Sequence, residues 1–532
     1  MTVAPTSPPA SPPGERVSMA RDARRVSALT MLSRVLGLVR EQIFALTLGA
    51  STSSDAFLAA FRIPNLLRDL FAEGALSAAF VPTYVSTLRN QSRPAAYALA
   101  NRVLSTLTIY LGLIAIVGMI FPGPIVHFVA RGFSPEKAAL CQTLVRIMLP
   151  YLPTISLAVV AMGALNAEEL YTTPALAPTM FNLVAIAGGL TVYGLGLSPR
   201  TAVMTWAALA VLGGVAQLAI QVPTLVRLGF RPRLTPDLRL RDPATRRIAA
   251  LMAPATLGVA AVQINVVINS SFASMVSDGA ISWLSYAFRL MQLPIGVFGV
   301  AVGTTALTHL SRDAARNDWP ALSGTLRRGL RMVLFLTVPS TVGLALLAVP
   351  IIRLIYEHGH FSARATEQTA RALFGYSFGL ASYASIKVVA PAFYALRRTR
   401  VPLIGSLLAV AANLAWNLAT FRGLGHVGLA LGTSIAATVN LAVLVFAYET
   451  QVKNLLTRDF FAGVVRILAA SAAMGVVVWF LSGRLELIAR TGLAVRLLKA
   501  IGPVVVGTVV YFFSARALGL EEAQTLLRRV RR

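Results

Sequence analysis

The sequence predicts an all-α membrane protein with about 14 transmembrane helices. Of its 532 residues, 56% are hydrophobic and only 13% are charged, whereas soluble domains are about 25% charged. Apolar stretches recur from end to end, and most are long enough to cross a hydrocarbon core about 30 Å thick. These stretches must be helical because backbone groups in lipid have to hydrogen-bond one another, and they lack the short alternating pattern of barrel strands.

Length and helix-breaking residues define the expected spans. Their approximate cores are 27–48, 56–88, 97–121, 140–166, 173–196, 203–226, 247–276, 281–310, 330–352, 368–396, 401–421, 427–449, 460–482 and 495–517. Arginines cluster before the first span, in the loops after the second, sixth, eighth and tenth spans, and at the end of the chain. This pattern predicts that those loops and both termini are cytoplasmic. It also accounts for the net charge of +27 without nucleic acid as a partner.

A repeated segment predicts two similar halves. Residues 61–80 and 288–307 align without gaps, so that Arg62 coincides with Arg289. Two copies about six spans apart favour two six-helix lobes in parallel orientation, with the last two helices added. The expected divisions are a disordered cytoplasmic N-terminus (1–24), an N-lobe (25–230), a C-lobe (231–455), two further helices (456–520) and a basic cytoplasmic tail (521–532).

Ionisable side chains inside the spans point most directly to function, because each costs about 2.5–3.5 kcal/mol at the bilayer centre. On a helical wheel of the first span, Ser33 and Arg40 lie about 20° apart. Arg34 and Glu41 form a neighbouring stripe, and Gly37 lies between the two. Such a polar wedge is typical of the wall of a hydrated cavity.

The second span carries Asp55, Arg62 and Glu73 on one face, with Arg68 beside it. Opposite charges on one face compensate each other or exchange partners between two conformations. Asp55 and Glu73, together with Glu41 of the first span, are therefore candidate gating residues.

Arginines in the first, second and eighth spans favour an anionic substrate, because a guanidinium matches phosphate oxygens with two parallel hydrogen bonds. The alternative is that these arginines lie at the membrane interface or in internal salt bridges, above all in the second span, where acidic neighbours are available. The candidate substrate-binding residues are Ser33, Arg34, Arg40, Arg62, Arg68 and Arg289.

Other chemistry is not indicated. The sequence has no phosphate-binding Walker motif and no HExxH motif. The single cysteine, Cys141, lies in an apolar stretch and is expected to be a small core residue. His358 and His360 lack a nearby set of metal ligands. We therefore expect no cofactor, no metal and no catalytic residue.

Two pairs of amides form a candidate cation site. Asn265 and Asn269 in the seventh span, and Asn413 and Asn417 in the eleventh, each lie four residues apart on one helix face. Amide oxygens bind Na⁺, but no carboxylate joins them, so hydrogen bonding between helices is the favoured interpretation. Coupling to Na⁺ or to the membrane potential stays open; the potential contributes about 2.3 kcal/mol per charge per 100 mV.

Several segments resemble the MurJ/MviN family of lipid II flippases. They are SRVLGLVRE (33–41), DAFLAAFRIPNLLRDLFAEGALSAAFVP (55–82), GALNAEELYTTPALAPTMFN (163–182), APATLGVAAVQIN (253–265), YAFRLMQLPIGVFGVAVGT (286–304), IYEHGHFS (355–362) and KVVAPAFYALRRTRVP (387–402). The resemblance runs from about residue 25 to 450.

The resemblance implies the fold of the MOP exporters, with two lobes in a V around a cavity that opens alternately to each side of the bacterial inner membrane. It implies that lipid II, an undecaprenyl-diphosphate disaccharide-pentapeptide, moves from the inner to the outer leaflet. The last two helices would form a groove for the lipid tail, and membrane lipids and the cell-wall synthesis machinery would be partners. Essential arginines of the family match Arg34, Arg40, Arg68 and Arg289, and acidic family positions match Asp55 and Glu73.

The eighth helix departs from the family pattern. Many relatives have an acidic residue just before the arginine and another three residues after it, where this sequence has Phe288 and Gln292. Arg289 therefore lacks those local counter-charges.

Alternative functions are a flippase for another polyprenyl-diphosphate oligosaccharide and a small-molecule antiporter of the MATE type. More remote alternatives are a membrane enzyme acting on lipid-linked sugar and a scaffold for cell-wall assembly. A drug antiporter would favour acids and aromatic rings for organic cations, whereas this cavity is predicted to be basic.

Overall fold

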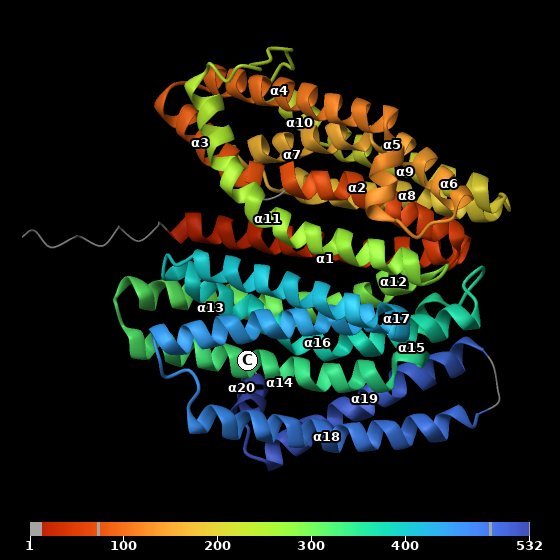
Figure 1. Cartoon of the computed structure of the whole chain (residues 1–532). Helices are drawn as coiled ribbons and strands as arrows, with labels where there is room; N and C mark the ends of the chain where they lie inside the picture. Colours follow the sequence, from red (N-terminus) through yellow and green to blue (C-terminus); the bar gives the residue numbers. More distant parts are fainter. Residues whose placement is uncertain (1–12, 72–74, 489–491, 531–532) are drawn as a thin grey trace, which may run out of the picture. The chain divides into compact units, whose positions relative to one another are not determined.

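The computed structural model describes residues 13–71, 75–488 and 492–530 (Figure 1). Those residues form α-helices and one π-helical turn, η1, with no strand among them, which confirms the all-α fold class. The helices are α1 (Pro13–Leu48), α2 (Thr52–Phe71), α3 (Ala75–Asn90), α4 (Arg93–Ile120), α5 (Pro122–Val129), α6 (Pro135–Met148), α7 (Tyr151–Ala167), α8 (Thr172–Gly194), α9 (Pro199–Ala219), α10 (Val222–Arg227), α11 (Pro243–Val276), α12 (Ala280–Pro294), η1 (Ile295–Gly299), α13 (Val300–Ala315), α14 (Trp319–Leu346), α15 (Ala348–Tyr356), α16 (Ala363–Ala395), α17 (Arg400–Gln451), α18 (Arg458–Glu486), α19 (Leu493–Ala517) and α20 (Glu521–Val530).

Ten helical segments in the described part of the chain are long and apolar enough to cross a membrane. One of them, α17, is broken at Gly425, whose φ of 57° and ψ of −139° are not helical. The break falls between the predicted spans 401–421 and 427–449, so α17 comprises two helices. The expected total of about fourteen spans stays a prediction.

Several predicted spans are interrupted, because prolines lack the N–H that continues a helix. Span 140–166 is divided between α6 and α7 at Leu149 and Pro150. Span 281–310 becomes α12, η1 and α13, with Pro294 at the junction. Span 330–352 becomes α14 and α15. Span 56–88 contains α2 and α3, and residues 72–74 between them lie outside the described residues. The length of an apolar run therefore predicted a crossing but not its internal breaks.

The N-terminus differs in part from its expected disorder. Residues 1–12 of the segment 1–24 lie outside the described residues, but α1 begins at Pro13 and runs without interruption to Leu48. The first span is therefore the later part of a longer helix.

The chain divides into two compact units. Unit 1 comprises residues 1–47, 60–122 and 141–259, and unit 2 comprises residues 48–59, 123–140 and 260–532. In unit 1, α7 packs against α3, α4 and α9, and α8 packs against α9. Cys141 is buried in this unit, as expected for a small core residue. The predicted lobe boundaries stay predictions.

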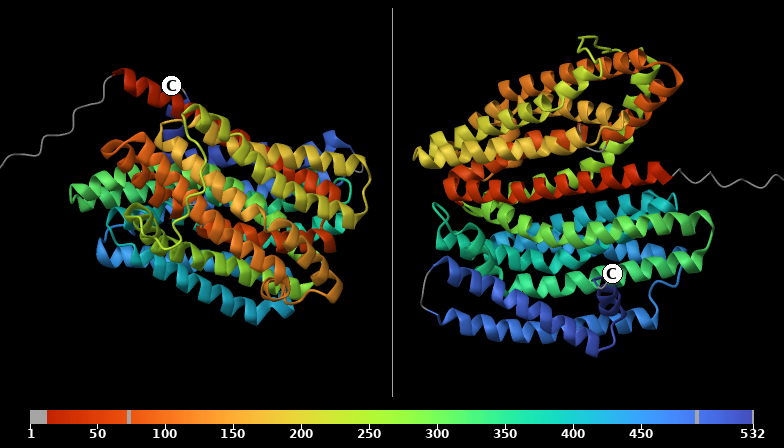
Figure 2. Two further views of the ribbon diagram at one scale, coloured as in Figure 1. Left: turned by 90° about the horizontal axis from the view of Figure 1, so that it is seen from above. Right: turned by 180° about the vertical axis from the view of Figure 1, so that it is seen from behind.

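In unit 2, α16 is the central helix. It packs against α12, α13, α14 and α17 (Figure 1). The helices α18 and α19 run beside each other in Figure 1 and in the right view of Figure 2, and they contact α14 and α15 of the same unit. A buried cluster that includes Phe335, Met474 and Tyr511 joins α14, α18 and α19.

Candidate functional site

The predicted polar wedge of α1 is held by one residue of α8, Asn182. The Arg40 guanidinium donates to Asn182 Oδ1 at 3.1 Å. Asn182 Nδ2 donates in turn to the Ser33 backbone oxygen at 3.0 Å and lies 3.4 Å from the Ser33 hydroxyl. Gly37 faces the same amide, and a Cβ on it would lie 3.8 Å from Asn182 Nδ2. Unit 1 therefore brings Ser33 and Arg40 together as the wheel predicted.

Two further contacts orient Arg40. Its Nη2 lies 3.3 Å from Glu41 Oε1, and its guanidinium carbon lies 5.3 Å from the centre of the Phe181 ring. The side chain keeps 21% of its surface exposed. Arg40 is thus fixed in direction while part of its side chain remains accessible, as an anion-binding residue requires.

Arg34 is exposed on α1, one residue beyond Ser33. Its neighbours Leu32 and Val35 are also exposed, at 45% and 54%. Arg34 therefore lies at an accessible part of the helix, on the stripe next to Arg40.

In the second predicted span, Arg68 pairs with its own neighbour. Its Nη2 lies 2.9 Å from Asp69 Oδ1, and both side chains are about one-quarter exposed, at 25% and 27%. Arg62 lies half-buried in the same helix. Glu73, the candidate gating residue, lies outside the described residues.

Asp55 is completely buried in unit 2, where it accepts four hydrogen bonds. Lys137 Nζ donates at 2.8 Å and the Gly279 N–H at 2.7 Å. Ser282 donates from its N–H at 2.9 Å and from its hydroxyl at 2.6 Å. The carboxylate therefore caps the N-terminus of α12, where the helix dipole favours negative charge.

Lys137 completes this cluster with a second carboxylate. Its Nζ lies 2.7 Å from Asp278 Oδ1, and the lysine side chain is only 3% exposed whereas that of Asp278 is 71% exposed. The sequence offered opposite charges on the second span as compensating or exchanging partners for Asp55. The hydrogen bonds described for Asp55 all go to Lys137 and to the beginning of α12.

Arg289 lies on the helix that Asp55 caps. It is exposed on α12, as is Gln292 one turn later. Phe288, at the position where the family resemblance implied an acidic residue, packs edge-on against Tyr376 at 5.3 Å and Tyr383 at 6.4 Å in α16. This half-buried side chain is therefore held by aromatic packing.

Three of the four candidate cation ligands come together in unit 2. Asn417 Nδ2 donates to Asn269 Oδ1 at 2.7 Å and to Asn413 Oδ1 at 2.8 Å, and Asn269 Nδ2 lies 3.3 Å from Thr433 Oγ1. Asn413 and Asn417 are fully buried. No described contact joins Asn265 to this group, and the Oδ1 atoms of Asn265 and Asn417 have no described hydrogen-bond partner.

Within the described residues, no group of three or more His, Cys, Asp or Glu side chains could hold a metal ion. The amides of the asparagine cluster mostly hydrogen-bond one another, which agrees with the favoured interpretation of contacts between helices.

Two residues of these sites were not predicted from sequence. Asn182 ends a motif that was recognised only as a resemblance, and a single amide in the middle of an apolar helix gives little signal alone. Lys137 follows Pro135 and Glu136 in an expected outer loop, where a lysine is normally solvated. Its burial depends on carboxylates that are distant in sequence.

The helical fold, with ten long apolar segments among the described residues, is that of a multi-pass membrane protein. An inward-facing MATE-family multidrug transporter of the MOP superfamily has this fold, with a TM-score of 0.64 at 17% identity, over 84% of this chain and 98% of that one. The solved structure of the lipid II flippase MurJ in an inward closed conformation gives a TM-score of 0.78 at 26% identity, over 95% of this chain and 99% of that one.

The sequence comparisons identify the family within that class. The profile of the lipid II flippase MurJ matches residues 44–498. The chain is 37% identical over 423 residues to the lipid II flippase MurJ of Burkholderia cenocepacia, covering 79% of this chain and 81% of the relative. It is 33% identical over 509 residues to a probable lipid II flippase MurJ of Vibrio cholerae, covering 93% and 95%. The chain belongs to the MurJ family of lipid II flippases, which are transporters and not enzymes.

Proposed function

We propose that this protein moves lipid II, the undecaprenyl-diphosphate-linked peptidoglycan precursor, from the inner to the outer leaflet of the bacterial inner membrane. Family membership over nearly the whole chain carries this proposal. The arginines on α1, α2 and α12 supply the chemistry, because a diphosphate is the anionic part of that substrate. The expected orientation has both termini in the cytoplasm.

The oriented guanidinium of Arg40 supports diphosphate binding. Asn182, Glu41 and Phe181 hold its direction, which lowers the side-chain entropy that binding would otherwise cost. Arg34 on the same helix and Arg289 on α12 offer further guanidinium forks. Ser33, Arg62 and Arg68 are proposed to line the same binding region.

Gating is proposed to use the acidic residues Asp55, Glu73 and Glu41. The buried pair of Asp55 with Lys137 is sensitive to its environment, because either partner left alone would be an uncompensated buried charge. A conformational change that withdraws Lys137 or the N-terminus of α12 from Asp55 is therefore strongly disfavoured unless the carboxylate gains water or a proton.

Transport is proposed to draw on the membrane potential. A cationic site that moves with the field gains about 2.3 kcal/mol per charge per 100 mV. The asparagine cluster supplies no carboxylate for Na⁺, and its amides hydrogen-bond one another. The melting temperature in NaCl is then expected to equal that in KCl; a selective rise in NaCl would restore the cluster as a Na⁺ site.

The decisive experiment is complementation of a bacterium depleted of its own lipid II flippase. Wild type is expected to restore growth and outer-leaflet lipid II, whereas Arg34→Ala and Arg289→Ala are expected to fail at equal membrane abundance. Arg316→Ala, at an exposed loop position, is the matched control and should rescue fully.

Three other outcomes would each favour a different function for this protein. No rescue by abundant wild type would contradict lipid II as the substrate and favour another polyprenyl-diphosphate sugar. Growth rescue without lipid II movement would favour a scaffold. Uptake of organic cations by vesicles that contain the purified protein would favour the antiporter.

A further inference from the structure

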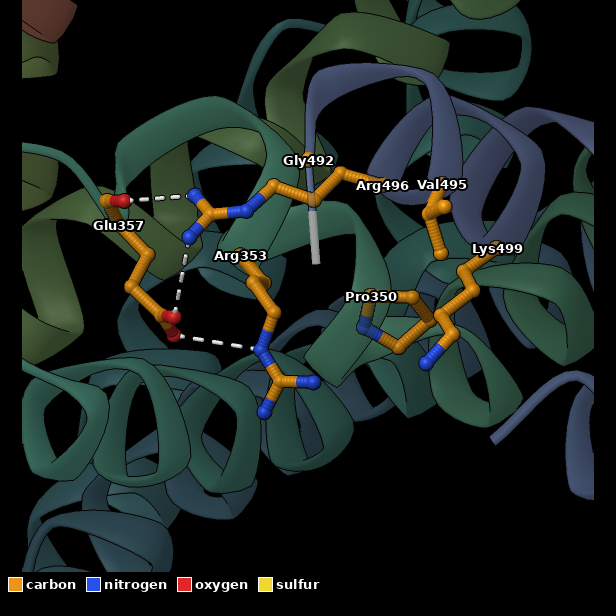
Figure 3. Close-up of a pocket in the computed structure, with 7 residues that line it drawn as sticks. All are labelled: Pro350, Arg353, Glu357, Gly492, Val495, Arg496 and Lys499. Atoms are coloured by element: carbon orange, nitrogen blue, oxygen red, sulfur yellow. Dashed lines mark hydrogen bonds and ion pairs between the residues drawn. The ribbon is translucent and has the colours of Figure 1, made fainter. Parts of the chain in front are cut away.

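A basic pocket lies in unit 2 between α15 and the beginning of α19. It has a volume of about 210 Å³, and it contains none of the residues of the candidate sites above. Its lining includes Pro350, Arg353, Glu357, Gly492, Arg496 and Lys499 (Figure 3). Three cations and one carboxylate give these residues a formal charge of +2 (3 − 1).

The single carboxylate orients both arginines without neutralising the pocket. Glu357 accepts from Arg353 Nε at 3.3 Å, and Arg496 Nη2 lies 3.8 Å away. Arg496 Nη1 donates to the Glu357 backbone oxygen at 2.8 Å. Lys499 donates to a neutral acceptor, the Ile488 backbone oxygen, at 2.9 Å. The terminal nitrogens of Arg353 point away from Glu357 (Figure 3).

The N-terminus of α19 adds to the positive potential. Gly492, at the helix cap, provides no side-chain hydrogen bond to the first turn. The N-terminus of a 25-residue helix carries a partial positive charge. Together with three cationic side chains, this charge suits a phosphate.

The surroundings of the pocket are apolar and exposed. On α19, Leu493 is 64% exposed, Leu498 is 49% exposed and Ile501 is 48% exposed. An exposed apolar face on a membrane-spanning helix faces acyl chains. The pocket also lies at the end of α19 that the sequence pattern assigns to the outer side, where the loops are otherwise poor in basic residues.

We propose that this pocket binds the phosphate headgroup of an anionic membrane phospholipid, whose acyl chains pack on the leucines of α19. A free inorganic anion would satisfy the basic side chains but would leave the apolar face without a partner. A zwitterionic lipid would satisfy the apolar face but would bring its own cation into a pocket that is already positive. This proposal does not depend on which substrate the protein flips.

The test measures lipid binding to the purified full-length protein in neutral detergent by native mass spectrometry. Phosphatidylglycerol is expected to bind at least tenfold more tightly than phosphatidylcholine. The variant Arg353→Gln/Lys499→Gln should lose roughly tenfold to thirtyfold in phosphatidylglycerol affinity, since each cation near a lipid phosphate contributes about a fivefold effect. Phosphatidylcholine binding should not change.

The matched control is Arg364→Gln/Arg484→Gln, which removes two exposed cations from the same unit and should bind phosphatidylglycerol as wild type does. Equal loss in both double variants, or equal affinity of wild type for the two lipids, would overturn the proposal. Displacement of phosphatidylglycerol by millimolar inorganic phosphate would show that the anion alone is the ligand. The comparison of lipids on wild type remains decisive even if the variant folds poorly.

Discussion

Arg40 and Asn182 show how one amide can direct a charge. Asn182 contacts both Arg40 and Ser33, so it links the two residues that the helical wheel placed on one side of α1. A guanidinium held in this way can present two donors to a phosphate, whereas an ammonium presents a point charge. The fork, and not the charge alone, is therefore expected to matter.

We predict that Arg34→Lys/Arg289→Lys keeps the net charge but loses most lipid II flipping. Each lost charge-assisted hydrogen bond is worth about 1.5–3 kcal/mol, which corresponds to a tenfold or larger loss of diphosphate binding. The measurement is outer-leaflet lipid II in the complementation strain. Full flipping by this double variant would contradict a diphosphate clamp; the control Arg316→Lys should be neutral.

The Lys137–Asp55 pair gives a prediction about stability. Lys137→Met should destabilise the protein by about 3–5 kcal/mol because it leaves a buried carboxylate without its cation. Lys137→Met/Asp55→Asn should recover part of that loss, since no charge is then unpaired. Thermal unfolding in detergent measures both variants.

Asp278→Asn is the control, because that carboxylate is 71% exposed and should cost less than about 1 kcal/mol. An equally small effect for Lys137→Met would show that Lys137 does not stabilise Asp55.

Sequence reasoning at this scale placed Ser33 and Arg40 together but missed Lys137. Ser33 and Arg40 share one helix, whose period determines which residues are neighbours. Lys137 and Asp55 lie 82 residues apart in the sequence, and no local sequence pattern predicts a contact between them. For the same reason, the packing of Phe288 against α16 could not be predicted from sequence, because it depends on how α12 and α16 lie beside each other.

At the scale of elements, the segment 231–242 is attached to α4 along its length. Asn101 accepts from the Arg233 N–H at 3.0 Å, and Ser105 accepts from the Thr235 N–H at 3.0 Å. Thr106 accepts from the Asp237 N–H at 2.9 Å. Polar side chains within about one and a half turns of α4 thus accept the hydrogen bonds that a neighbouring strand would accept in a sheet. The segment 231–242 is therefore held in place without being helical.

The Asp237 side chain accepts hydrogen bonds from two residues at the end of this segment. Its pKa predicts that the local stability of the segment depends on pH. Hydrogen bonds from the N–H groups of Arg241 and Asp242 hold the pKa of Asp237 below its ordinary value of 3.8. The resulting stabilisation is complete above that ordinary value and is lost as the pH falls through the lower folded pKa. Amide exchange of residues 238–242 should therefore accelerate in strong acid.

The variant Asp237→Asn isolates the effect. It should exchange faster than wild type at neutral pH and should lack the acid-dependent step at these amides. If the exchange rates of these amides depended on pH in the same way in wild type and variant, Asp237 would be excluded as the titrating group.

The breaks in the helices were the least predictable elements. The two spans of α17 follow from the sequence, because Gly425 tolerates the positive φ at their junction. The π-helical turn η1 does not, since apolar residues continue through it and only packing against α16 reveals it. In α13, just after this turn, a Cβ on Gly303 would lie 2.4 Å from the Lys387 backbone oxygen in α16, so this close contact requires glycine.

At the scale of the whole molecule, the sequence predicted a membrane protein, because a chain that lies in lipid has long apolar stretches and few charged residues. The family followed from motifs that are contiguous in sequence. The orientation of the chain in the membrane stays a prediction, and the buried native cysteine makes it easy to measure. Cys141 is 1% exposed, so it should react little with a membrane-impermeant maleimide.

We predict opposite labelling of two exposed alanines in a Cys141→Ala background. Ala363→Cys, at the beginning of α16, should be labelled in intact spheroplasts. Ala315→Cys, at the end of α13, should be labelled only after lysis. Both positions are exposed, so accessibility is matched, and the reverse result would invert the proposed topology.

The pairing of Asp55 also has a consequence for biogenesis. Lys137 is synthesised 82 residues after Asp55, and Gly279 follows Asp55 by 224 residues. At about 5–20 residues per second, the carboxylate waits about 4–16 s for its lysine and about 11–45 s for the helix that it caps. Three of its four hydrogen bonds come from residues 279–282. A nascent chain that ends before this point therefore holds a carboxylate that still needs water or the insertion machinery as its partner, and the polar cluster is completed only late in translation.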